Sequence, residues 1–190
     1  MSLYQQMLES GLIPQPGTRC LFVLMEAATQ QELLARMTFH DTVHRCLWRG
    51  DAIHGMEFRA PWLAQVEPGS AFDTWTGASM PALSATLITA SLPFDALWRH
   101  LRRFAKFEAD GRKYFLRLGD AASLRLYTAS LADQPDAVTR FFAQGDIRHY
   151  YFHDPRVGLA CSVHPVFEIG TPDDAREGCL VWRDATLEAS

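Results

Sequence analysis

An apolar run at residues 20–28, CLFVLMEAA, is the feature that most constrains the fold. Its length fits one β-strand, and the scarcity of polar positions indicates a buried central strand. The segment TQQELLARMTF follows at once. Thr29 is the expected N-cap of a helix there, with Glu32 three residues later in the capping-box position. A buried strand that leads directly into a helix predicts an α/β fold.

The size of the chain indicates one domain. It has 190 residues, of which 48% are apolar and 21% charged, an ordinary composition for a soluble globular protein. This length supports one substantial core and is short for two typical domains. We expect a single lobe at residues 20–167, a mixed β-sheet packed with helices. An arm or short helix at residues 1–19, with the segment IPQPGT, precedes it, and a peripheral hairpin or tail at residues 168–190 follows.

Further elements follow in order along the chain. HRCLWRGDAI is expected to be a strand that ends in a turn at Gly50 and Asp51. FRAPWLAQVEPG is expected to be an edge strand, because Pro61 has no N–H to donate to a sheet. SAFDTWTG predicts a short helix capped by Ser70, and SATLITAS predicts another strand.

A helix is predicted over residues 92–104, where apolar residues recur at helical spacing. Pro93 and Asp95 suit its first turn, and Asp95 is placed to pair with Arg99 one turn later. The apolar stripe should pack on the sheet. It consists of Phe94, Leu97, Trp98, Leu101, Phe104 and Ala105.

A β-hairpin is predicted directly after this helix. Asp110 and Gly111 form a strong turn signal, since a type I′ turn needs positive φ at both positions. The turn places Phe107 opposite Tyr114 and Glu108 opposite Lys113. One face should pack on the core and the other should carry charge outward. The apolar face is Phe107, Tyr114, Leu116 and Leu118, and the charged face is Glu108, Lys113 and Arg117.

The helix-plus-hairpin unit carries a basic cluster. Arg99, Arg102 and Arg103 lie opposite the apolar stripe, and Lys113 and Arg117 extend them if the hairpin folds beside the helix. The net charge of −4 and the lack of zinc-finger or RNA-binding signatures argue against nucleic acid.

A solvated face and a contact surface for an acidic or polar protein partner both remain open. Arginine is favoured in interfaces, so we treat the cluster as a hypothetical partner-binding site. Burial of these arginines against Asp120 would assign them to the scaffold instead.

No catalytic, cofactor or metal site is expected. GASMP half-resembles a nucleophile elbow around Ser79, but a proline replaces the second glycine that the turn needs. Two histidine pairs have i,i+4 spacing, yet both segments look strand-like, which separates such residues too far for one ion. These pairs are His40 with His44 and His149 with His153.

The compartment is expected to be the cytoplasm. No export signal opens the chain, and no apolar stretch approaches the ~20 residues of a membrane span. The four cysteines lie far apart, which favours reduced, mostly buried thiols over a disulfide framework. They are Cys20, Cys46, Cys161 and Cys179.

Taken together, these segments resemble the adaptor chaperones of bacterial type VI secretion effectors. The ordered motifs are CLFVLMEAATQQELLARM, CLWRGD, APWLAQVEP, FDTWTG, LITASLPFDALWRHLRRF and DGRKYFLRLGD. They run from about residue 20 to residue 154. Among the motif positions are Trp98, Leu101, Asp110, Gly111 and Asp120. The family's Asp-Pro at the end of the hairpin is replaced here by GDAAS.

The resemblance implies a non-enzymatic protein without cofactors. Such a protein binds an effector toxin in the cytoplasm and helps load it onto the VgrG spike. Two alternatives stay open: a small hydrolase-like enzyme, and an immunity-type or structural binder that blocks an effector. A spike gene upstream and a toxin gene downstream would favour the adaptor.

Overall fold

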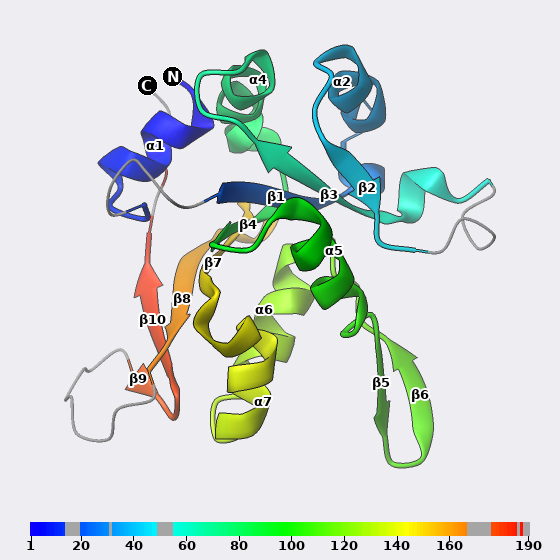
Figure 1. Ribbon diagram of the computed structural model, residues 1–190, viewed down its shortest axis with the longest axis vertical. Coiled ribbons are helices and arrows are strands. Elements are labelled where there is room, and N and C mark those ends of the chain that lie inside the picture. The colour runs from blue at the N-terminus through cyan, green and yellow to red at the C-terminus, as the bar shows by residue number, and fades with distance from the viewer. Residues whose placement is uncertain (14–19, 31, 49–54, 167–175, 186, 188–190) are drawn as a thin grey trace.

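An eight-stranded antiparallel sheet forms the centre of the protein (Figure 1). The computed structural model describes residues 1–13, 20–30, 32–48, 55–166, 176–185 and 187. The strand order is β2-β3-β1-β4-β7-β8-β10-β9. The strands are β1 (Cys20–Glu26), β2 (His44–Cys46), β3 (Pro61–Val66), β4 (Ala85–Ala90), β7 (Ile147–Asp154), β8 (Leu159–Pro165), β9 (Arg176–Glu177) and β10 (Leu180–Asp184). The α/β class with helices packed on a sheet is confirmed. A mixed sheet was expected, but every pairing among these strands is antiparallel.

Helices cover both faces of this sheet (Figure 1). One face carries α1 (Leu3–Glu9), α2 (Leu33–Phe39) and α4 (Ala71–Ser79). The other carries α5 (Phe94–Arg102), α6 (Ala121–Ala129) and α7 (Pro135–Phe141). Along β1, Phe22 and Leu24 enter the core under α5, and Leu21 and Val23 enter the core under α1. Because both faces of β1 are buried, its sequence shows no polar alternation.

Two of the predicted strands lie at the expected position in the sheet, and one does not. β1 and β4 are interior, and all of β4 is buried. The prediction that the strand beginning at Pro61 lies at an edge is wrong, since β3 lies between β2 and β1. Pro61 is the first residue of β3, where the missing N–H breaks no interior ladder. The edge strand on this side of the sheet is β2, and β9 forms the opposite edge.

The predicted capping box after β1 is also wrong. Residues Ala27–Thr29 form a 3₁₀ turn, and α2 begins only at Leu33, with Glu32 at the N-cap position. The Glu32 carboxylate instead forms an ion pair with Arg36 at 2.9 Å. The prediction for Ser70 is confirmed, because its hydroxyl oxygen accepts a hydrogen bond from the Asp73 amide at the start of α4.

Both ends of the chain contribute to the main body. Helix α1 packs on α4, where a Cβ at Gly77 would collide with the backbone of residues 1–3. Strands β9 and β10 extend the central sheet beside β8, and Leu180 is fully buried. Two sequence predictions lie outside the described residues: the turn at Gly50 and Asp51, and most of the IPQPGT segment.

The hairpin forms a separate two-stranded sheet of β5 (Lys106–Ala109) and β6 (Arg112–Phe115). Its predicted register is confirmed, and Asp110 and Gly111 have φ values of 52° and 70°. The hairpin projects away from the body (Figure 1).

The prediction of a packed apolar face on this hairpin is wrong toward the tip. Leu118 is buried and Leu116 is partly buried against the core, but Tyr114, nearer the turn, is 41% exposed. Only the base of the hairpin reaches the core, because the strands lead outward from the end of α5. The side chains of Phe107, Glu108 and Lys113 lie outside the described part.

Candidate interaction surface

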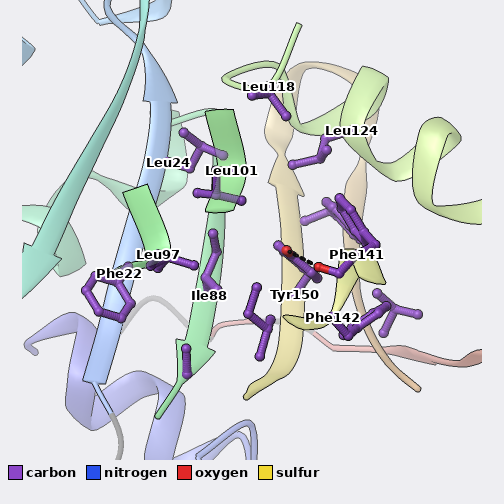
Figure 2. Close-up of a cluster of buried hydrophobic side chains, with 14 of the residues drawn as sticks. Phe22, Leu24, Ile88, Leu97, Leu101, Leu118, Leu124, Phe141, Phe142 and Tyr150 are labelled. Atoms are coloured by element: carbon purple, nitrogen blue, oxygen red, sulfur yellow. Dashed lines mark hydrogen bonds between the residues drawn. The ribbon is translucent and has the colours of Figure 1, made fainter. Parts of the chain in front are cut away.

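Helix α5 is fixed on the sheet by its apolar stripe. Leu97 and Leu101 are fully buried, and Phe94 is 9% exposed. Figure 2 shows Leu97 and Leu101 among Phe22, Leu24 and Ile88 of the central strands. Phe104 is partly buried at the end of the stripe. Since the buried side of α5 is set by these contacts, its arginines must face outward.

Trp98 lies partly buried at the border of the apolar stripe and contacts the neighbouring arginines. The guanidinium carbons of Arg45 and Arg102 lie 4.7 Å and 4.4 Å from the centre of the Trp98 ring. Trp98 Nε1 donates a hydrogen bond of 2.8 Å to the carbonyl oxygen of Cys46 in β2. Cation–π contacts of this kind hold an arginine in place without neutralising its charge. Trp98 therefore ties α5 to the edge strand and presents two cations.

The resulting surface, which we call the α5 basic face, consists of Arg45, Arg99, Arg102 and Arg103. Arg99 and Arg103 are exposed and form no ion pair among the described residues. The predicted Asp95–Arg99 pair is wrong, because Asp95 binds Arg45 at 2.9 Å.

His100 adds no charge to this face. It lies partly buried, with Nε2 3.0 Å from the carbonyl oxygen of Phe141, and burial lowers the pKa of its imidazole. The α5 basic face is thus a surface of four arginines with one acid.

Arg117 lies in a different environment. Its Nε and Nη2 bind both carboxylate oxygens of Glu26, at 3.2 Å and 2.6 Å. The Glu26 side chain is 7% exposed, and the guanidinium also lies 3.5 Å from Asp120. The hydrogen bond to Glu26 raises the pKa of Arg117. Arg117 is therefore joined to the end of β1, although its side chain remains 62% exposed.

A second arginine is held in the same way nearby. Arg156 binds Asp154 through Nε at 2.9 Å and Nη2 at 2.6 Å, and Ser84 donates to the same carboxylate at 3.0 Å. The hydrogen bonds from Arg156 hold the pKa of Asp154 at about 2. Arg156 also interacts electrostatically with Asp120 and Glu26. We call Glu26, Arg117, Asp120, Asp154 and Arg156 the ionic cluster.

The topology of the sheet brings the ionic cluster together. Glu26 ends β1, Asp154 ends β7, and β4 lies between these two strands. Asp120 is the N-cap of α6 and accepts from the Ser123 amide at 2.7 Å. A Cβ at Gly119 would lie 2.6 Å from Glu26 Cγ, so glycine permits this close approach.

Sequence reasoning did not identify Glu26, Asp154 and Arg156. Two signals were present: one acid at the end of an otherwise apolar strand, and the tripeptide Asp-Pro-Arg after a second strand. Neither signal indicates which residue the acid or the arginine would bind. Arg45 was missed for the same reason, since its contacts with Trp98 and Asp95 cross about 50 residues of sequence.

The residues considered for catalysis or metal binding are spread over the end of α4, the end of α2, β2 and β7. Ser79 ends α4, and His153 Nε2 contacts the Met80 carbonyl oxygen at 2.8 Å. His44 Nδ1 contacts the Thr42 carbonyl at 2.7 Å, while His40 packs beside Phe72. His149 lies on β7 beside Thr89. Within the described ranges, no three histidine, cysteine or acidic side chains gather as metal ligands.

All four cysteines are free thiols, with Cys46 and Cys161 buried. In the part of the chain that the structure describes, no helix combines the length and apolar character needed to cross a bilayer.

Comparison with known proteins gave one match. The family described as a domain of unknown function, DUF4123, matches residues 21–136. Neither the curated proteins nor the solved structures contain a match to this chain. The matched segment begins in β1, includes α5, the hairpin and α6, and extends to the start of α7. Because it covers more than half of the sequence, the chain belongs to the DUF4123 family.

Proposed function

We propose that this protein is a cytoplasmic adaptor that binds a type VI secretion effector and helps load it onto the VgrG spike. Membership of DUF4123, a family associated with type VI effectors, is the observation that carries the proposal. The motifs that resemble the adaptor chaperones lie largely in the same segment. The role is one of binding, without catalysis or a cofactor.

The α5 basic face supports this proposal as a contact surface. Arg99 and Arg103 repeat the same charge one turn apart on a helix, which costs a few tenths of a kcal/mol when no partner is present. Arg45 and Arg102 are already placed by Trp98. Side chains that are ordered before binding lose less conformational entropy on association. An effector with acidic or carbonyl-rich surface would fit this face.

Co-expression with a toxin from the neighbouring genes, if one is encoded there, tests the proposal. The toxin is expected to co-purify with the wild-type chain, and its secretion should require the adaptor. The double variant R99E/R103E should lose most of the retained toxin, since opposite charge across an interface is replaced by like charge. Arg36→Glu on α2, across the sheet, is the matched control and should retain it.

The proposal is wrong if the wild-type chain retains no neighbouring toxin. Secretion that is blocked rather than supported would instead identify an immunity-type binder. Hydrolysis of a substrate by the purified chain would identify an enzyme.

A further inference from the structure

A groove between α6 and the β7–β8 connection lies apart from the α5 basic face. Its volume is about 360 Å³. The lining residues that matter here are Ala122, Arg125, Leu126, Val157, Leu159 and Cys161. Most of them are apolar, and they come from α6, the β7–β8 connection and the start of β8.

Two large aliphatic side chains stand exposed at this groove. Leu126 is 64% exposed and Val157 is 67% exposed. Single exposed aliphatic residues are common on protein surfaces and need no explanation. Two of them that flank one groove form an apolar rim, and covering such a rim by a partner removes apolar area from water.

The ionic cluster adjoins this groove through Arg156, which directly precedes Val157. Arg117 and Arg156 each bind a carboxylate through Nε and Nη2. Among the described residues, no hydrogen bond is found for either Nη1 group, so each guanidinium keeps one side of its donor fork for another acceptor. The carboxylates fix both guanidinium groups in place before any partner arrives.

The charges exposed at this place are predominantly positive. The side chains of Glu26, Asp120 and Asp154 are 7%, 14% and 3% exposed, whereas those of Arg117 and Arg156 are 62% and 57% exposed. Arg125 adds a third cation, 5.1 Å from the centre of the Trp182 ring. Among the described residues, Asp184 is the one acid that lines the groove. A partner would therefore meet guanidinium groups beside an apolar rim.

We infer that this groove and the adjoining arginines bind a protein segment in which aliphatic side chains alternate with carboxylates. The aliphatic side chains would cover Leu126 and Val157, and the carboxylates would take the open donors of Arg117 and Arg156. A free inorganic anion would use the arginines alone and leave the rim uncovered. The inference rests on the proposed function only in assigning the segment to the delivered protein.

Peptide titration of the whole purified chain tests this inference without the effector. The probe is a capped peptide of alternating glutamate and leucine, measured by fluorescence anisotropy. Two matched peptides replace all glutamates by glutamine or all leucines by serine. Saturable binding of the first peptide is expected, with at least about tenfold weaker binding of either matched peptide.

The double variant L126D/V157D should weaken binding by a similar factor, and R99E/R103E should leave it unchanged. Because Leu126 and Val157 are exposed, both variants should unfold at the wild-type midpoint, and L126S/V157S serves if the acidic variant does not. The inference is overturned if no peptide binds saturably, or if L126D/V157D binds as wild type does. It is also overturned if inorganic phosphate or the serine peptide binds equally well. Co-purification of the toxin is a separate result, so failure here leaves the proposed function standing.

Discussion

The α5 basic face and the ionic cluster use the same residue type in opposite ways. Arg99 and Arg103 stand without ion-pair partners in the described structure, while Arg45 and Arg102 lie over an aromatic ring. Arg117, only 14 positions after Arg103, binds a buried carboxylate instead. The difference shows that position in a basic run does not decide what an arginine does. Its partners decide it, and these come from distant strands.

The largest expected loss of stability comes from truncating a buried side chain that packs α5 on the sheet. Leu101→Ala deletes a fully buried side chain, and the loss of transfer free energy with the resulting cavity should destabilise the fold by about 2–5 kcal/mol. Urea unfolding measures the loss. Leu126→Ala is the matched control and should change the free energy of unfolding by less than about 0.5 kcal/mol. An equally small effect at Leu101 would contradict the packing of α5 on the sheet.

Neutralising a carboxylate of the ionic cluster should cause the next largest loss of stability. Asp154→Asn keeps the shape but weakens three bonds from Arg156, one of them from its backbone amide, and one from Ser84, which should cost about 1–3 kcal/mol of stability. Asp184→Asn, at an exposed acid, should have little effect in the same unfolding measurement. If the two variants behave alike, the ionic cluster is not part of the scaffold.

The same carboxylate predicts how stability depends on pH. The pKa of Asp154 in the folded protein is about 2, below its ordinary value of 3.8. A lowered pKa stabilises the fold above the ordinary value, and the contribution disappears as pH falls from about 4 toward 2. The difference in unfolding free energy between wild type and Asp154→Asn should shrink by up to about 2 kcal/mol across that range. A difference that stays constant would contradict the lowered pKa.

Local patterns predicted the parts of this fold that depend on neighbours in sequence. The apolar runs of β1 and β4, the stripe of α5 and the register set by Asp110 and Gly111 all follow from periodicity or turn chemistry. The projection of the hairpin could not be predicted, because it depends on where the end of α5 meets the sheet.

The candidate site was predictable only in part, for a related physical reason. Arg99, Arg102 and Arg103 follow from helical spacing alone. The contact of Glu26 with Arg117 spans 91 positions and exists only because β1 and the start of α6 meet in the folded sheet. The contact of Trp98 with Arg45 likewise needs α5 to lie against β2. Such pairings are set by topology rather than by local pattern.

The smallest expected change in stability belongs to the α5 basic face, and it gives the most direct test of the proposed role. In R99E/R103E the free energy of unfolding should stay within about 1 kcal/mol of wild type, because both side chains are exposed. Titration of the same variant with an effector toxin that co-purifies with the wild-type chain should show at least about tenfold weaker binding, and added salt should weaken wild-type binding. Unchanged affinity together with unchanged stability would make these arginines a solvated face and contradict their role in partner binding.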